Sequence, residues 1–337
     1  MKNKIVLIFF LLSILLYFGC DKKEKDNKVI VSNNNVIEQK INYKNGDEYT
    51  FKYGFTKGKI YKYKILSKSQ NVQIQGDQSQ TSNIEIQYIL SIDPIEVDSS
   101  GEFILKVRFN SIKVNAVLGN QIISYDSENP ADTIKKRNPA FAEYVAFQHS
   151  DYNLRLGING EVLEIFRVDN ILNNILGENI KNINDNLKNQ LRTNIEYQLK
   201  SISQQMFQYL PEKSQKLNST WSKTTIEKLG EDDAKNIALY RFLKVEPRNN
   251  KEIAIINAEL QSETKKRQSV EKEGVKYEFD KPKISGSGVI EFDLENGMVT
   301  KKDLKTNFIF GMKITKGGQK IEAQSKVNNS VLIELIN

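Results

Sequence analysis

Hydrophobic and polar residues alternate along much of the chain with a period of two. Tyr61, Tyr63 and Ile65 alternate with lysines, and the same alternation runs through residues 84–90 and 103–109. A strand with one apolar and one polar face is typical of an antiparallel sheet that buries one side. The pattern therefore predicts a first block of half-buried antiparallel strands.

A turn signal predicts a hairpin at the end of this block. Asn159 and Gly160 divide two short apolar segments between Leu154 and Phe166. Asn-Gly is favoured in two-residue type I′ turns, because both central residues need a positive φ. We therefore expect a type I′ hairpin at this point of the chain.

The period becomes helical between residues 184 and 210. Apolar residues recur there at steps of three and four: Leu187, Leu191, Ile195, Leu199, Ile202, Met206 and Tyr209. This spacing places them on one side of a helix that ends before Pro211. At about 1.5 Å per residue, such a helix is long enough to cross the face of a sheet.

Alternation returns after the helix and continues to the C-terminus. Candidate strands cover 221–229, 234–246, 252–263, 286–293, 298–314 and 320–335, and the charged stretch 265–283 is predicted to be a long hairpin or a loop. No linker rich in Pro, Gly or Ser separates the two strand blocks. We therefore predict one α+β domain over residues 45–337, an antiparallel, β-rich body in two strand blocks with a long central amphipathic helix packed on the sheet.

The beginning of the chain has the pattern of a bacterial export signal. Lys2 and Lys4 precede an apolar run over residues 5–18, which ends at Gly19 and Cys20. A small residue before the cleaved bond and a thiol after it are what a lipoprotein signal requires, and the run is short for a membrane span. We predict a signal peptide over residues 1–19, cleavage after Gly19, and lipidation of Cys20 with fatty acids such as palmitate.

The next segment has no sustained period. Residues 21–42 are polar and charged, so residues 20–44 are predicted to form the lipidated cysteine and a flexible tether. The alternative is an uncleaved N-terminal anchor with an incidental cysteine. Both interpretations hold the chain on a membrane of the cell envelope, facing the periplasm or the exterior.

Composition narrows the possible chemistry. The chain has 39% apolar and 27% charged residues, and it has one Cys and one His. One Cys cannot form a disulfide within the chain, and one Cys and one His exclude most metal sites and most forms of His-based catalysis. Its net charge is +7, and removing Lys2 and Lys4 with the signal leaves 47 basic and 42 acidic residues, or +5. The excess is mostly lysine without a cluster of Arg and aromatic residues, so we expect no nucleic-acid partner.

Several short landmarks occur in an order that resembles one protein family. They are Gly58 to Ile65, Ser124-Tyr125-Asp126-Ser127, Asn159-Gly160, Tyr209-Leu210-Pro211, Ser219-Thr220-Trp221, Gly286-Ser287-Gly288 and Asp293 to Gly297. Over about residues 45–337 the chain is similar to a family of uncharacterised exported lipoproteins of Bacteroidota, which is a domain of unknown function. The family usually has Gly-Asp before the tryptophan, where this chain has Asn218-Ser219-Thr220. The resemblance implies a β-rich, extracytoplasmic protein and no catalytic residues.

Three motifs are candidates for catalytic or ion-binding sites. His149 lies beside Ser150 and Asp151, but the chain has no Gly-x-Ser-x-Gly elbow for a nucleophile. The run 231–233 is acidic without the spacing of a calcium loop, and 286–288 lacks the rest of a phosphate-binding motif. We predict solvated turns or close strand packing at these motifs, and neither catalytic residues, a metal nor another cofactor.

Aromatic residues suggest two alternatives for the interior. Trp221 is predicted to lie in the core, and aromatics spaced two apart precede and open the first strands: Tyr49, Phe51, Tyr53, Phe55, Tyr61 and Tyr63. They fit a sheet face packed tightly against the helix. They also fit a curved sheet that holds an apolar ligand such as a lipid.

Three functions therefore remain open. The first is a non-enzymatic, membrane-anchored binding or scaffold protein of the cell envelope, with envelope proteins as partners. The second is a carrier or sensor of a hydrophobic ligand, which requires an apolar cavity between helix and sheet. The third is a hydrolase with a carboxylate pair, which requires two convergent acids with shifted pKa values.

Overall fold

The protein is built around one large antiparallel sheet. A computed structural model describes residues 43–129, 141–177, 183–229, 232–264 and 269–336. The predicted signal peptide, Gly19, Cys20 and nearly all of the predicted tether lie outside these residues. Among the described helices, none is long and apolar enough to cross a membrane.

The first half of the chain supplies one side of the sheet and the helices. Its elements are β1 (Lys44–Asn45), β2 (Glu48–Tyr49), β3 (Tyr61–Gln75), β4 (Gln78–Val97), β5 (Phe103–Leu118), β6 (Gln121–Asp126), α1 (Ala142–Gln148), β7 (Asp151–Leu156), β8 (Val162–Phe166), α2 (Asp169–Leu176) and α3 (Asp185–Met206). β1 and β2 form a small hairpin of their own. The predicted strands around 61–65, 84–90 and 103–109 are confirmed as parts of β3, β4 and β5.

The second half supplies the other side of the sheet. Its elements are β9 (Thr220–Leu229), β10 (Asp232–Arg248), β11 (Lys251–Thr264), β12 (Val270–Lys272), β13 (Val275–Phe279), β14 (Lys283–Asp293), β15 (Met298–Lys316) and β16 (Gln319–Ile336). β15 covers the predicted strand 298–314, runs through Gly311 and ends two residues beyond the prediction, at Lys316. The charged stretch after β11 contains the hairpin of β12 and β13, and β13 pairs with β15.

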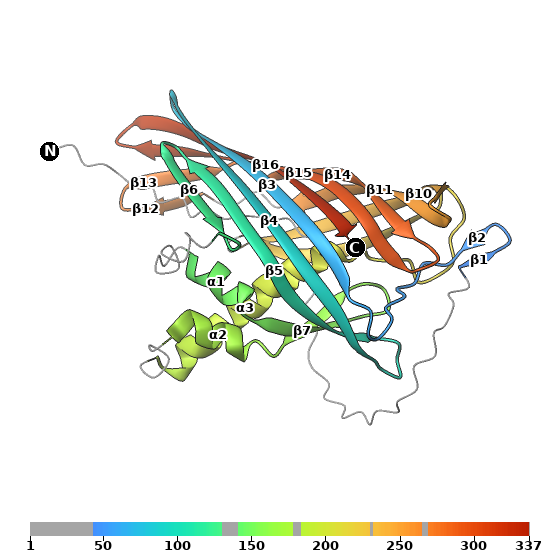
Figure 1. The fold of residues 1–337 in the computed structure, drawn as a ribbon. Helices are drawn as coiled ribbons and strands as arrows, with labels where there is room; N and C mark the ends of the chain where they lie inside the picture. The colour runs from blue at the N-terminus through green and yellow to red at the C-terminus, as the bar shows by residue number, and fades with distance from the viewer. Residues whose placement is uncertain (1–42, 130–140, 178–182, 230–231, 265–268, 337) are drawn as a thin grey trace.

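The two predicted strand blocks are a single 14-stranded sheet. The strand order is β8-β7-β5-β4-β3-β16-β15-β14-β11-β10-β9, with β6 paired to β5. The last strand, β16, pairs with β3 on one side and β15 on the other. The C-terminal strand therefore closes the gap between the two halves of the chain (Figure 1).

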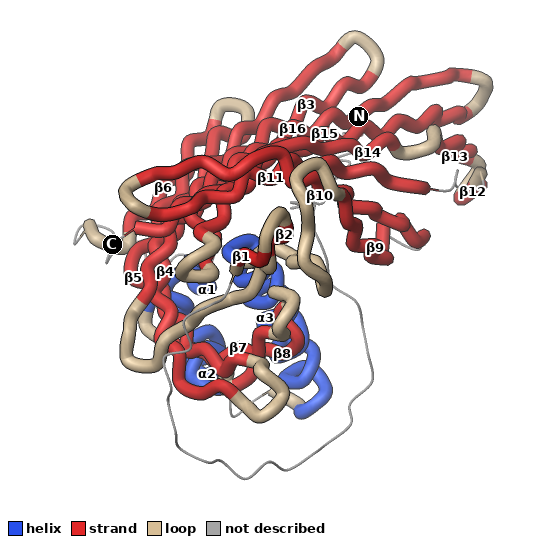
Figure 2. Tube along the Cα trace, turned by 90° about the vertical axis from the view of Figure 1, so that its right-hand side faces the viewer, coloured by secondary structure: helices blue, strands red, loops and turns tan. Residues whose placement is uncertain are grey.

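The predicted fold class is wrong. Of the described residues, 62% are in strands and 15% are helical, and among them there is no long central amphipathic helix packed across the sheet. A helix does form at 185–206, but Leu187 is exposed and the buried apolar positions begin at Ile195. α3 packs mainly on β8 and α2, and α1 packs on β5 (Figure 2). The helical spacing of apolar residues predicted the helix correctly. The surface on which the helix packs depends on how strands distant in the sequence pair, which the spacing does not show.

The hairpin around Asn159 and Gly160 is confirmed, but its turn type is different. The loop between β7 and β8 spans Gly157 to Glu161 and is closed by a hydrogen bond from Gly157 N to Glu161 O of 2.8 Å. Gly160 has φ +84°, whereas Asn159 is not among the residues with positive φ. A type I′ turn needs two such residues, so this longer loop is not one.

The main core lies between the sheet and the helices. We call the sheet face that faces the helices the inner face. It buries Ile65, Leu90, Val107, Ile256 and Ile290 against the helical layer and the segment 51–55. Residues 51–55 are not part of a strand, although their alternating aromatic residues fitted a sheet face.

Candidate functional site

Buried polar contacts join the helices to the inner face. Lys302 on β15 is 3% exposed, and its Nζ donates to the backbone oxygen of Phe207, at the end of α3, at 2.9 Å. Burial lowers the pKa of Lys302 to about 7. The Tyr53 hydroxyl donates to Gln208 O at 3.0 Å, and burial raises the pKa of Tyr53 far above its usual value. These groups fix the end of α3 on the sheet.

A second set of polar contacts holds the β7–β8 loop. Gln204 on α3 accepts from Val162 N at 2.8 Å and donates to Gly160 O at 2.9 Å. Tyr152 and Ser203 share a hydrogen bond of 2.8 Å. These residues therefore satisfy backbone and hydroxyl groups in the interior, which is a structural role.

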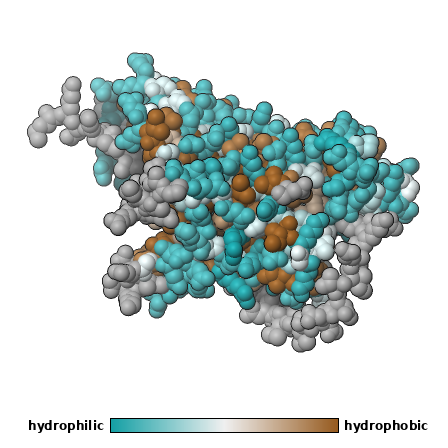
Figure 3. Space-filling view, viewed as in Figure 1, coloured by the Kyte–Doolittle hydropathy of each residue, from teal (hydrophilic) through white to brown (hydrophobic). Residues whose placement is uncertain are grey.

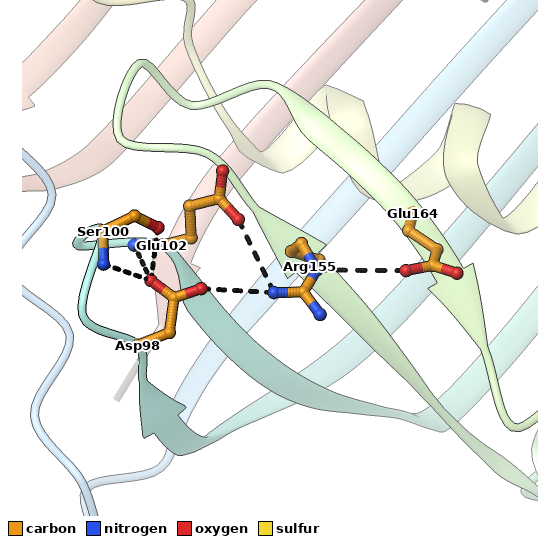
Figure 4. A network of polar contacts seen from close by, with 5 residues as sticks. All are labelled: Asp98, Ser100, Glu102, Arg155 and Glu164. Atoms are coloured by element: carbon orange, nitrogen blue, oxygen red, sulfur yellow. Dashed lines mark hydrogen bonds and ion pairs between the residues drawn. The ribbon is translucent and has the colours of Figure 1, made fainter. Parts of the chain in front are cut away.

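An acidic and basic cluster ties the β4–β5 turn to β7 (Figure 4). Arg155 lies 3.2 Å from Asp98 Oδ2, 3.5 Å from Glu102 and 3.9 Å from Glu164. Burial alone would raise the pKa of Asp98, but hydrogen bonds from Ser100 and Glu102 and the charge of Arg155 lower it overall. Each of these acids lies beside Arg155, so the cluster holds the β4–β5 turn and β8 against β7.

The residues weighed as a Ser/His/Asp site do not converge. His149 is an exposed residue at the end of α1. Ser150 accepts a hydrogen bond from Asn174 at 3.0 Å, and Asp151 forms ion pairs with Lys106 at 3.1 Å and Arg108 at 3.3 Å. Ser150 and Asp151 therefore each interact with residues other than His149.

The other weighed motifs lie in structural positions. Glu231 is outside the described residues, and among the described ones no group of three or more His, Cys, Asp or Glu could hold a metal ion. Gly286 and Gly288 face neighbouring strands so closely that a Cβ at residue 288 would lie 2.3 Å from Asp303 O. Trp221 donates to Tyr209 O at 3.1 Å and packs beside the ring of Phe51. Close strand packing at the glycines and a packing role for Trp221 are thus confirmed.

The space between helices and sheet is filled by side chains. Tyr53 contacts the rings of Phe207 and Phe292 with centroids at 5.9 and 5.8 Å, and Leu199 and Met206 of α3 are completely buried. A ligand between α3 and the sheet would have to displace this core. The hypothesis of a hydrophobic ligand between the helix and the sheet therefore loses support.

A second apolar cluster lies on the inner face, farther along the strands. It is separate from the main core and comes from five neighbouring strands: Ala234, Leu260, Ile284, Phe308 and Val327, with Phe310 packed against it. Ile284 pairs with Phe308, and Phe308 with Val327, so these three form a row across the sheet. We call this part of the sheet the distal inner face.

A polar and small-residue belt separates the two clusters. On β15 and β16 it contains Thr306 and Asn329, joined by a 3.4 Å hydrogen bond. On β14 it contains Gly286 and Gly288. Asn236 on β10, which is 2% exposed, lies beyond this belt, because Gly286 pairs with Leu260 and Leu260 pairs with Ala238. The distal inner face therefore begins where the helix-covered core ends.

Two oxygens of this face lack hydrogen-bond partners among the described residues. They are Asn236 Oδ1 and Ser262 Oγ, and the two residues are directly paired across β10 and β11. Buried polar atoms normally have partners, and leaving one unsatisfied costs about 1–3 kcal/mol. Periodicity places both residues on the inner face, but only the strand register shows that they are neighbours.

The family assignment rests on a match over residues 100–299, which is more than half of the chain. The matching model is described as a family of unknown function (DUF6263). The chain belongs to this family. The predicted resemblance to an uncharacterised family is confirmed at that level, whereas lipidation and a bacterial group are not part of the finding.

Comparisons beyond the family are distant. No curated protein matches the chain. A solved structure on lipid–protein interactions in lipovitellin aligns at 9% identity and a TM-score of 0.46, covering 84% of this chain and 25% of that one. OccK7 (OpdD) of Pseudomonas aeruginosa aligns at 5% identity and a TM-score of 0.16, covering 83% and 99%. Neither likeness is close enough to indicate a shared function.

Proposed function

We propose that the protein is a non-enzymatic binding protein of the cell envelope, anchored by lipid on Cys20 after cleavage at Gly19. It faces the periplasm or the exterior and works through contacts with envelope proteins or lipid. The short apolar run that ends at Gly19 and Cys20 supports the anchor. The family has no established function, so the proposal depends on this signal and on the body to which it is joined.

The observation that carries the proposal is the position of the tether on the body. The described chain begins at Tyr43, whose hydroxyl donates to Glu295 at 3.4 Å in the turn between β14 and β15. β3 begins at this same end of the sheet, because the end of β16 pairs with the start of β3 and with the start of β15. β4 ends there too, because Tyr61 pairs with Ile92. The tether therefore reaches the body at one end of the strands, which we call the tether end.

Aliphatic side chains are exposed at the tether end. Ile60 and Val97 are 60% and 51% exposed, and Ile158, beside Gly101, is 64% exposed. Elsewhere on the molecule exposed apolar residues are scattered among hydrophilic ones, as Figure 3 shows for one face. Exposed aliphatic residues beside a lipid tether suit a body that meets the membrane at this end.

The carboxylates support a binding protein over a hydrolase. The pKa values of Asp98 and Asp151 are lowered, because hydrogen bonds and ion pairs outweigh the effect of burial. Glu143 is the described carboxyl group whose pKa is raised, by burial, and its hydrogen-bond partner is Gln198. No second acid with a raised pKa accompanies it among the described residues, so the hydrolase hypothesis gains no pair of convergent acids.

A Cys20→Ser variant in a bacterial host that processes lipoproteins tests the anchor. We expect the wild-type chain to take up labelled palmitate and to fractionate with the envelope membrane. The Cys20→Ser chain should lose the label and accumulate as a longer, unprocessed precursor. Ser13→Ala, inside the apolar run, is the matched control and should behave as wild type. A wild-type chain without label would exclude lipidation.

The carrier or sensor of a hydrophobic ligand is the second candidate. The observation that favours it is the apolar cluster on the distal inner face, a second buried cluster that is separate from the main core. Native mass spectrometry of the chain isolated from its own envelope would show whether lipid accompanies it at a fixed ratio. A bare protein would leave only the scaffold or protein-binding role.

A further inference from the structure

The distal inner face combines an apolar row with an unsatisfied polar pair. Asn236 Oδ1 and Ser262 Oγ are opposite each other on β10 and β11, buried and without partners among the described residues. Two members of the apolar cluster are close by on the same strands. Ala234 lies two residues from Asn236 on β10, and Leu260 lies two residues from Ser262 on β11. The row then continues through β14, β15 and β16.

The arrangement has the two parts that an amphipathic molecule requires. The row from Asn236 to Val327 crosses four strand spacings of about 4.8 Å, or about 19 Å in all. This distance suits an extended long acyl chain lying across the strands. Asn236 Oδ1 can only accept a hydrogen bond, and Ser262 Oγ can donate or accept one.

The described residues of the row are uncharged. The row begins at Thr225 on β9, which pairs with Asn236 on β10. Its other residues are Ser262, Ile284, Phe308 and Val327. A carboxylate or phosphate on the ligand would be desolvated there without a cation. A hydroxyl group, in contrast, can donate to Asn236 Oδ1 and bond to Ser262 at the same time.

We propose that the distal inner face binds an uncharged lipid, a long acyl or alkyl chain with a terminal hydroxyl group. The hydroxyl bonds to Asn236 and Ser262, and the chain lies over Leu260, Ile284, Phe308 and Val327. The proposal rests on the second candidate function and specifies its ligand class. It does not depend on the anchor at Cys20.

The test uses residues 21–337, because both apolar clusters and the residues packed against them come from Tyr43 onward. Hexadecanol, its methyl ether and palmitic acid are delivered from cyclodextrin, and binding is measured by native mass spectrometry and by mutual competition. The three probes share a chain and differ only in the end group. We expect one hexadecanol per protein, bound more tightly than either the ether or the acid.

Two substitutions separate the polar contact from general apolar binding. Asn236→Leu should weaken hexadecanol about tenfold, the effect of losing roughly one hydrogen bond, and leave the methyl ether nearly unchanged. Ser262→Ala, a smaller change, should reduce the same preference and provides a second reading if Asn236→Leu fails to fold. Leu239→Asn, on the exposed side of β10, is the matched control and should bind as wild type.

Several results would overturn the proposal. They are no binding of any probe, equal binding of alcohol and ether, tighter binding of the acid, or an unchanged preference in both variants. If palmitate still labels Cys20 in such a case, the anchored binding protein stands and only the ligand site fails. If the probes bind as expected but Cys20 is unlabelled, the ligand site stands without the anchor.

Discussion

The amine of Lys302 is buried in the interior, where it donates to a backbone oxygen. Its Nζ reaches Phe207 O, where the partial negative charge of the α3 C-terminus also favours a cation. Burial nevertheless outweighs these contacts and lowers the pKa of Lys302 to about 7. The contact therefore positions the end of α3, while the burial of the amine lowers the free energy of unfolding near neutral pH.

Replacing Lys302 with methionine should change both the level and the pH dependence of stability. In the unfolded chain the pKa of lysine is near 10.4, so between about pH 7 and pH 10 the unfolded state binds more protons. The wild-type free energy of unfolding should therefore rise with pH through this window, by up to about 4 kcal/mol from Lys302.

Lys302→Met should remove that rise and make the folded state more stable at pH 7 or below. Urea unfolding at a series of pH values measures the difference. Lys301→Met, on the adjacent residue of β15, is the control and should retain the wild-type slope. Parallel slopes in wild type and Lys302→Met would contradict the lowered pKa.

Gly288 shows how closely β14 and β15 approach. An added Cβ would lie 2.3 Å from Asp303 O and 2.6 Å from Leu304 Cδ2, so backbone would have to move. We expect Gly288→Ala to destabilise the fold by about 1–3 kcal/mol in denaturant unfolding. Ser287→Ala, whose side chain is exposed on the other face, should change stability little. Equal effects would show that β14 can shift without cost.

At the scale of the element, α3 has two unlike halves. Asn184 caps its start by accepting from Leu187 N at 2.8 Å, while the first turns are exposed. Its last turns are fixed through Gln204, Phe207 and Gln208. The helix is therefore anchored at its C-terminal end and relies on its own cap at the other.

Removing the cap should loosen the exposed half of α3. Asn184→Ala should reduce local helix stability by about 1 kcal/mol, because one N-terminal donor loses its partner. Hydrogen exchange of the first two turns should become several times faster, with the last turns unaffected. Asn189→Ala, inside the helix and exposed, should leave exchange unchanged or slower. Faster exchange along the whole helix would mean that its two ends are coupled.

At the scale of the whole molecule, β16 joins the two halves of the sheet. It pairs along nearly its full length with both β15 and β3, and its Ile333 is completely buried in the core. Without it, both neighbours would become long unpaired edges. The two halves therefore form one sheet through β16.

Deleting residues 319–337 should abolish cooperative folding. We expect loss of the sharp thermal transition and aggregation through the exposed strands, measured by circular dichroism and light scattering. Deleting Asn337 alone is the control and should leave the transition in place. A truncated chain that melts cooperatively would show that the two halves are independent domains.

The sequence determined the strands, the helix position and the core aromatics, because these depend on local periodicity. Alternation located β3, β4 and β5, and a four-three spacing located α3. The sequence also predicts an export signal that ends at Cys20, and it contains no strong catalytic motif. Local patterns are sufficient for such features, since each is contained within a few neighbouring residues.

Only the tertiary structure decided how these elements combine. The pairing of β16 with β3 merged two strand blocks into one sheet, and this made the predicted α+β architecture wrong. The pairing of Asn236 with Ser262 likewise produced the polar pair of the distal inner face. Both results depend on which residues of two paired strands lie opposite each other. This register is fixed by the packing of the whole sheet and not by the sequence next to each residue.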